Sequence, residues 1–275
     1  MSTLSVAAAL AEARRSGLDR LEAQLLLAAL LGVDRAWLLA HDDAPLAPEQ
    51  AQRFADWLAR RLQDVPLAYL SGSKEFHGLM LQVNEYTLVP RPDTEVLVDW
   101  ALELAPDLGP APRVVDLGTG SGAIALALKH RHPAARVCAV DQSPGALAMA
   151  ARNARELGLE VEFLQGDWWQ PLAGRRFELV LSNPPYIAGD DPHLPALRHE
   201  PRSALTPGGD GLAALRQLVA EAPDHLVPGG FLLLEHGFDQ AEAVAALLAA
   251  RGFDEVANRR DLGGQPRVSG GRWPG

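Results

Sequence analysis

The chain has 275 residues, of which 48% are hydrophobic and 22% are charged, and its formal net charge is −10. This length suits one large domain with a small companion, and the hydrophobic share is ample for a folded core. The acidic balance argues against a broad nucleic-acid-binding face. The single cysteine, Cys138, lies in the apolar run 137–140. A single cysteine excludes an intramolecular disulfide, and its apolar neighbours predict that the thiol is buried and structural.

The first part of the chain reads as helical. Asp19, followed by Glu22 three residues on, resembles a capping box, and the apolar run after them stops at Gly32. A second helix is expected near residues 49–62. The longest apolar runs are far shorter than a membrane span, and no basic-then-apolar leader is visible, so we expect a cytoplasmic protein without membrane contact.

Two further segments complete the expected domain organisation. Residues 73–90 read as a hairpin linker between a helical domain, residues 1–72, and a larger domain, residues 91–275. The motif Pro90-Arg91-Pro92-Asp93-Thr94-Glu95 is expected to open a helix with Asp93 or Thr94 as its N-cap. We assign no ligand contact to residues 91–95.

From residue 113 onward, strand and helix patterns alternate. Apolar strands that alternate with helices indicate an α/β fold whose parallel sheet is covered on both faces. The expected strands are residues 113–117, 136–140, 161–164, 177–181 and 231–234. The expected helices are residues 122–130, 144–157, 211–222 and 240–251.

A glycine-rich loop follows the first of these strands. Its residues are Asp116, Leu117, Gly118, Thr119, Gly120, Ser121 and Gly122. Glycines let the backbone turn sharply and approach a ligand at the carboxyl edge of the sheet. With Ala123 and Asp141, the loop also satisfies a dinucleotide-binding fingerprint, so a nicotinamide-dependent oxidoreductase is an alternative.

Two acidic residues favour S-adenosylmethionine, which has an amine, a ribose and a sulfonium but no phosphate. Asp116 precedes the first glycine and could meet the ammonium group, while Asp141 could accept from the ribose hydroxyls. After the strand at 161–164, Asp167 could accept from the adenine amino group and Trp168 could lie against the adenine ring. The loop residues Gly118, Thr119, Gly120, Ser121 and Gly122 complete this candidate cofactor site.

The strand at 177–181 leads into the corner Asn183-Pro184-Pro185-Tyr186. Each proline fixes its own φ and restricts the residue before it, so the Asn183 side chain and the nearby carbonyls are aimed with little freedom. Prolines donate no N–H, and the corner is therefore rich in acceptors, with Tyr186 as a flat stacking surface. It suits a planar group that carries an NH2, either a nucleobase or an amide.

At this point the chain resembles the release-factor glutamine N5-methyltransferases (the PrmC/HemK type) along nearly its whole length. The resemblance is carried by the glycine loop, the Asn183 corner and several flanking motifs, namely Glu75-Phe76-His77-Gly78, residues 90–95, Asp191-Pro192-His193-Leu194, Glu200-Pro201, Ala204-Leu205, residues 208–212 and Glu235-His236-Gly237. The corner alone is shared with adenine-N6 DNA methyltransferases. The flanking motifs point to release factors.

The resemblance implies a class I, Rossmann-like methyltransferase that uses S-adenosylmethionine, needs no metal and binds no nucleic acid directly. Its substrate would be the glutamine of the Gly-Gly-Gln motif in peptide chain release factors, with the helical domain helping to grip the release factor. Residues 118–122, Asp141, Trp168 and Asn183 would contact the cofactor, whereas Asn183, Pro184, Pro185 and Tyr186 would contact the substrate. Asn183, Pro184 and Tyr186 are the candidate catalytic residues. An adenine-N6 DNA methyltransferase stays open as an alternative.

Overall fold

The computed structural model describes residues 4–275, which form two compact units, residues 4–72 and 73–275. The hairpin expected as a linker falls within the second unit. Within the described residues, no helix is both long and apolar enough to cross a membrane.

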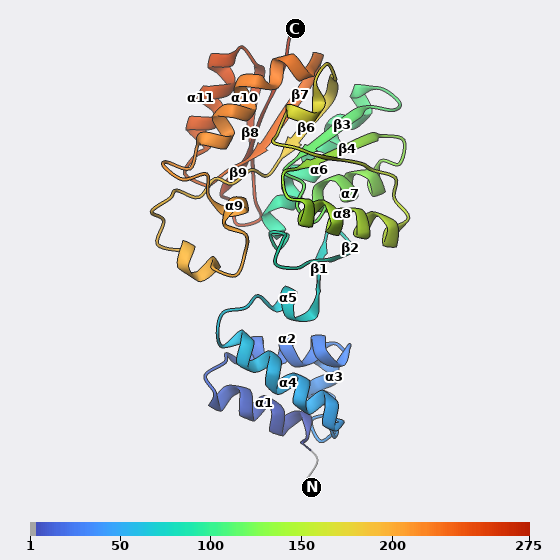
Figure 1. The fold of residues 1–275 in the computed structure, drawn as a ribbon, viewed down its shortest axis with the longest axis vertical. Helices are drawn as coiled ribbons and strands as arrows, with labels where there is room; N and C mark the ends of the chain where they lie inside the picture. Colours follow the sequence, from blue (N-terminus) through green and yellow to red (C-terminus); the bar gives the residue numbers. More distant parts are fainter. Residues whose placement is uncertain (1–3) are drawn as a thin grey trace. The chain divides into compact units, whose positions relative to one another are not determined.

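The first unit is helical, as its sequence predicts (Figure 1). Its helices are α1 (Val6–Arg15), α2 (Arg20–Leu31), α3 (Arg35–Ala40), α4 (Pro48–Arg61) and α5 (Leu67–Ser71). Asp19 caps α2 by accepting from the Leu21 N–H at 2.7 Å, and Gly32 ends this helix in the left-handed region. Leu26, Leu27 and other apolar side chains of these helices form a buried core.

The second unit contains a seven-stranded sheet in the described part of the chain, with strand order β5-β4-β3-β6-β7-β9-β8 (Figure 1). Its strands are β3 (Arg113–Leu117), β4 (Arg136–Asp141), β5 (Glu162–Gln165), β6 (Phe177–Ser182), β7 (Leu226–Glu235), β8 (Asp254–Arg260) and β9 (Pro266–Arg272). Strands β3 to β7 run parallel, as predicted, and β9 pairs antiparallel with both β7 and β8. The β8–β9 pair was missing from the sequence prediction.

Helices cover both faces of this sheet because its central strands are apolar on both sides. One face packs on α6 (Glu95–Leu104), α7 (Ala123–Arg131) and part of α8 (Pro144–Leu157). The other face packs on α10 (Ala213–His225) and α11 (Ala241–Arg251). Adjacent residues of β3 show the alternation: Val114 points into the first core and Val115 into the second. Cys138 is buried in the second core, as expected.

The remaining elements are short. They are η1 (Pro92–Thr94), η2 (Ala105–Leu108), η3 (Gln170–Leu172), η4 (Leu194–Leu197) and α9 (Arg202–Leu205). The expected helix after Pro90 forms as η1 followed by α6, but within the described chain neither Asp93 nor Thr94 caps it through a side-chain hydrogen bond. Thr94 occupies the N-cap position of α6, as predicted, but its hydroxyl accepts a hydrogen bond from Asn183 and not from the helix backbone.

The hairpin β1 (Ser73–Phe76) and β2 (Leu79–Gln82) is antiparallel, as its sequence predicts. Asn153 of α8 attaches it to the sheet domain. The Asn153 amide nitrogen donates to the carbonyls of Gln82 and Ser121, and its oxygen accepts from the Gln82 N–H at 2.8 Å. One buried amide therefore joins the hairpin to the glycine loop.

Candidate active site

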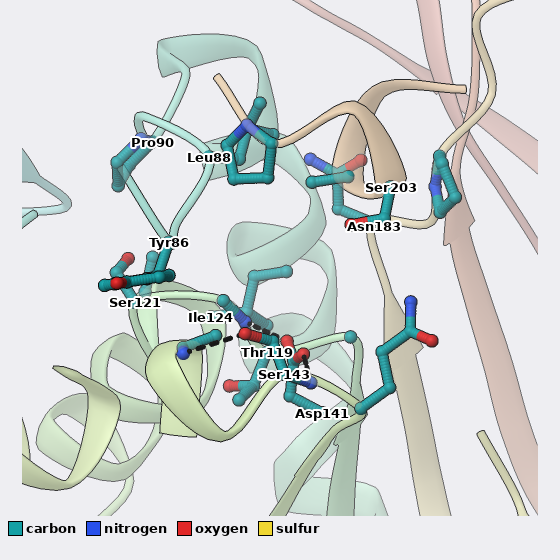
Figure 2. Close-up of a pocket in the computed structure, with 18 of the residues that line it drawn as sticks. Tyr86, Leu88, Pro90, Thr119, Ser121, Ile124, Asp141, Ser143, Asn183 and Ser203 are labelled. Carbon is teal, nitrogen blue, oxygen red and sulfur yellow. Dashed lines mark hydrogen bonds between the residues drawn. The ribbon is translucent and has the colours of Figure 1, made fainter. Parts of the chain in front are cut away.

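The site lies at the carboxyl ends of the parallel strands, where the loops after β3, β4, β5 and β6 surround a cavity of about 290 Å3. Figure 2 shows Thr119 and Asp141 at one side of this pocket and Asn183 and Ser203 at another. Its wall includes Phe76, Tyr86, Leu88, Pro90, Arg91, Thr94, Gly118, Thr119, Gly120, Ser121, Ile124, Asp141, Ser143, Asp167, Trp168, Asn183, Pro185 and Ser203. Residues far apart in sequence thus share one pocket.

The glycine loop and Trp168 form one side of the pocket. A Cβ at Gly118 would lie 3.1 Å from the Trp168 ring, so the absence of a side chain lets the indole cover the loop. Trp168 itself has a φ of +46°, which is unusual for a residue with a side chain. Gly122 does not line the pocket. A Cβ there would lie 2.9 Å from Leu126, so this glycine allows the close packing of α7.

Asp141 ends β4 and is fixed by two backbone donors. Its Oδ2 accepts from the Gly120 N–H at 2.9 Å, and its Oδ1 accepts from the Ser143 N–H at 2.8 Å. Burial raises the pKa of this carboxyl, and the two N–H donors oppose the rise. Each oxygen keeps further acceptor capacity toward the pocket, so the geometry suits a ligand with two neighbouring hydroxyls.

Asp116 is placed differently from the expectation. Its side chain is fully buried and does not line the pocket. Its Oδ2 accepts from the Thr119 hydroxyl at 2.6 Å and from the Ala125 N–H at 3.3 Å, while its Oδ1 has no partner among the described residues. Burial raises the pKa of Asp116 to about 7. Asp116 thus supports the glycine loop from beneath through these hydrogen bonds. Its buried position does not support the predicted contact with an ammonium group.

Asn183 follows the end of β6 and lines the pocket together with Pro185. Its amide nitrogen donates to the Thr94 hydroxyl at 3.1 Å. With the nitrogen held this way, the amide oxygen is the group left to accept from a ligand. The corner therefore has the acceptor character that its sequence predicts.

Pro184 and Tyr186 of the same corner are not part of the pocket wall. Pro184 is buried, and the Tyr186 ring packs against the core beneath β6 and β7. The Tyr186 hydroxyl donates to Glu235 Oε1 at 3.1 Å, and its carbonyl accepts from Gln240. These two hydrogen bonds hold Tyr186 in place. Its ring, which we expected to stack on a ligand, faces the core.

Several pocket residues were not predicted from the sequence. Thr94 contacts Asn183, and Tyr86 reaches the pocket from the segment after β2. Arg91 also lines the pocket and pairs with Glu200, whose side chain is only 3% exposed. The motif residues 90–95 and Glu200 were recognised as a pattern, but their contacts join positions more than 80 residues apart, which no local signal reveals.

The fold and the site together define a class of protein. A mostly parallel sheet with a glycine loop after β3 and an acid at the end of β4 is the Rossmann-like arrangement of class I methyltransferases. Residues 94–212 match the methyltransferase small domain family, and residues 4–72 match the PrmC N-terminal domain family. The predicted fold class is confirmed.

Sequence relatives identify the family. The chain is 51% identical to the release factor glutamine methyltransferase of Bordetella pertussis, over 93% of this chain and 95% of the relative. It is 50% identical to the protein of the same name from Xylella fastidiosa, over 97% and 98% of the two chains. A methyltransferase structure from Pyrococcus furiosus shares the fold, with a TM-score of 0.55 and 21% identity over 80% of this chain and 99% of that one. The chain belongs to the release factor glutamine methyltransferase family, as its motifs predict.

Proposed function

We propose that this protein transfers a methyl group from S-adenosylmethionine to the side-chain amide nitrogen, N5, of the glutamine in the Gly-Gly-Gln motif of peptide chain release factors. Family membership supports this activity. The observation that carries it is the Asn183 side chain, which lines the pocket with its nitrogen committed to Thr94 and its oxygen left as an acceptor. Such a substrate would place the reaction in the cytoplasm.

The residues around the glycine loop fit the cofactor. Asp141 would accept from the ribose hydroxyls, Trp168 would cover the adenine, and Gly118, Thr119, Gly120 and Ser121 would follow the rest of the molecule along the loop. Gly122 and Asp116 would support the loop from behind. S-adenosylmethionine, when bound, would supply a methyl group on a sulfonium sulfur, and the electron pair of the broken carbon–sulfur bond would stay on the sulfur.

The substrate side must align a weak nucleophile, because the glutamine nitrogen shares its lone pair with the carbonyl. The Asn183 oxygen would accept one N–H group, with Pro185 against the amide. The Pro184 carbonyl is the predicted acceptor for the other N–H group, although Pro184 itself does not line the pocket. Alignment of this kind can supply on the order of 7 to 11 kcal/mol of a barrier. The acceptors bind more strongly as positive charge develops on nitrogen, so they favour the transition state. The nitrogen then loses a proton to water or to a nearby group.

The helical domain, residues 1–72, would dock the release factor, and residues 91–275 would carry the reaction. Leu21 and Leu25 of α2 support a docking role because both are large, apolar and exposed. They lie four residues apart, so they share one face of the helix.

The proposal is tested by incubating the protein with methyl-labelled S-adenosylmethionine and a release factor. We expect label in the wild-type release factor and none in its variant with Gln→Ala in the Gly-Gly-Gln motif. Duplex DNA in the same assay examines the adenine-N6 alternative, and a thermal-shift comparison of S-adenosylmethionine with a nicotinamide dinucleotide examines the oxidoreductase. Labelled DNA, or stabilisation by the dinucleotide alone, would overturn the proposal.

A further inference from the structure

Glu235, at the end of β7, is a buried carboxylate that the proposed reaction does not use. Its side chain is 1% exposed. Its Oε1 accepts from the Tyr186 hydroxyl at 3.1 Å, while its Oε2 has no hydrogen-bond partner among residues 4–275. The next residue, His236, has its own partner in Ser269 at 2.6 Å. A buried acceptor without a donor is costly, so a donor near Oε2 is expected to turn toward it.

Thr94 is the candidate donor, because its hydroxyl lies close enough to Glu235 to stabilise the charged carboxylate. Strands β6 and β7 are paired so that Ser182 lies opposite Leu234, and the next residues along the two strands are Asn183 and Glu235. The hydroxyls of Thr94 and Tyr186 both favour the charged form of Glu235. Burial outweighs them and raises the pKa of Glu235 to about 7.

Two further charges face Glu235 from neighbouring elements. Arg267 of β9 favours the charged form and Asp93 of η1 opposes it. These two residues also pair with each other at 3.3 Å, so their effects on Glu235 partly cancel. The carboxylate therefore depends on its hydroxyl neighbours.

The orientation of the Asn183 amide is the property at stake. The oxygen and nitrogen of an amide occupy nearly the same space, and a hydroxyl can either accept from one or donate to the other. Thr94 alone therefore does not decide which end of the Asn183 amide enters the pocket. The orientation of the Asn183 amide depends on which neighbouring group accepts the hydroxyl proton of Thr94.

We propose that Glu235 is a positioning residue that takes the Thr94 proton and thereby turns the Asn183 oxygen toward the substrate amide. An ionised carboxylate only accepts, so it directs the Thr94 proton to itself and leaves a Thr94 lone pair for the Asn183 nitrogen. The Asn183 oxygen is then presented to the pocket. This inference rests on the proposed function, because that function requires the Asn183 oxygen to accept from the substrate and the inference explains why the oxygen faces the pocket.

A matched pair of variants at Thr94 tests the chain of hydrogen bonds in the full-length protein. Thr94→Val keeps the shape and removes the hydroxyl, and we expect kcat to fall about 30-fold with cofactor affinity within about twofold, measured by calorimetry. Thr94→Ser restores the hydroxyl and should recover kcat to within about threefold of wild type. Equal kcat in Thr94→Val and wild type, or equal loss in both variants, would overturn the proposal.

The pH dependence separates positioning from a purely structural role. Protonated Glu235 becomes a donor and no longer directs the Thr94 proton, so wild-type kcat should fall as pH drops through about 7. Tyr186→Phe removes a donor to the carboxylate, which raises its pKa and should move this acidic limb to higher pH. Glu235→Gln should lower kcat and abolish the limb. A limb that both variants leave unchanged contradicts the proposal.

A readout without turnover separates this inference from the proposed function. The sequence has four asparagines, so the Asn183 side-chain NH2 can be followed by NMR after selective nitrogen-15 labelling. We expect slow hydrogen exchange of one Asn183 amide proton in wild type and fast exchange in Thr94→Val and Glu235→Gln. If wild type shows slow exchange yet methylates nothing, the proposed function alone fails. If exchange is equally fast in wild type, the positioning role fails whatever the activity.

Discussion

Asp116 and Glu235 are both fully buried carboxyls whose pKa burial raises to about 7. The folded protein therefore binds more protons than the unfolded chain between about pH 4 and 7. Stability falls with rising pH wherever the folded state binds more protons. The free energy of unfolding should thus decrease as pH rises through this window, by on the order of 3 to 4 kcal/mol for each group.

Asp116→Asn should flatten this pH dependence. The amide oxygen can still accept from Thr119 and Ala125, while the NH2 replaces the oxygen that has no partner. The quantity to compare is the free energy of unfolding of the variant minus that of wild type. We expect this difference to be more favourable to the variant at pH 7.5 than at pH 5, as measured by urea unfolding at both pH values. A difference that is the same at both pH values would show that Asp116 titrates normally.

Asn183 and Asp141 should separate into distinct kinetic roles. Asn183→Ala removes the proposed acceptor and should lower kcat by about 100-fold with cofactor affinity nearly unchanged. Asp141→Ala removes the carboxylate that also holds Gly120 and Ser143, and should weaken cofactor binding at least tenfold. Calorimetry and single-turnover assays on the two variants measure this split. Reversed effects would exchange the proposed roles.

The contrast between Asn183 and Thr94 shows what the sequence could predict about the site. Asn183 and Asp141 follow apolar strands, and the carboxyl ends of parallel strands share one edge, so local patterns place both. Thr94 and Glu235 belong to recognised motifs, but their contacts depend on pairing between β6 and β7 and on packing of η1. Asp116 was expected in the pocket because a carboxylate beside a glycine loop does not reveal which way its side chain turns.

At the scale of elements, the sequence predicted the strands whose apolar character is local. It missed β8 and β9 because β8 is almost entirely exposed and β9 contains Gly270 and Gly271. Both patterns are atypical of strands. Tertiary packing explains the glycines: a Cβ at Gly270 would lie 2.3 Å from the Leu233 side chain and 2.9 Å from the backbone oxygen of Leu232 in β7, so a side chain does not fit beside that strand. Pairing with β7, and not propensity, forms β9.

The ion pair between Arg91 and Glu200 connects the segment before α6 to the segment after η4 and holds one wall of the pocket. Glu200 also accepts from the Val89 N–H at 3.0 Å. Glu200→Ala leaves that N–H unsatisfied, whereas Arg91 is 37% exposed and can turn to solvent. We expect a loss of about 2 kcal/mol in stability and a weaker cofactor complex.

Glu200→Gln is the matched control for this pair, because it can still accept from Val89 but lacks the charge. It should keep most of the stability and show a smaller rise in the cofactor dissociation constant. Thermal unfolding with and without S-adenosylmethionine compares the variants. If S-adenosylmethionine stabilises both variants and wild type equally, the pair between Arg91 and Glu200 does not contribute to cofactor binding.

At the scale of the whole molecule, a reaction centre of about 290 Å3 admits a side chain but cannot by itself recognise a protein the size of a release factor. Recognition then depends on surface outside the pocket. Leu21 and Leu25 are 46% and 39% exposed on one face of α2, and burial of such side chains against a partner contributes to affinity.

Replacement of both leucines by glutamate should therefore raise KM for an intact release factor about tenfold, with kcat and cofactor affinity unchanged. A short Gly-Gly-Gln peptide, which reaches the pocket without docking elsewhere, should be methylated equally by the variant and wild type. Leu262→Glu is the control, since Leu262 is fully exposed in the turn between β8 and β9 and should have no effect. If KM for the peptide and the intact factor rise together, the helical domain acts on the pocket, not on the partner.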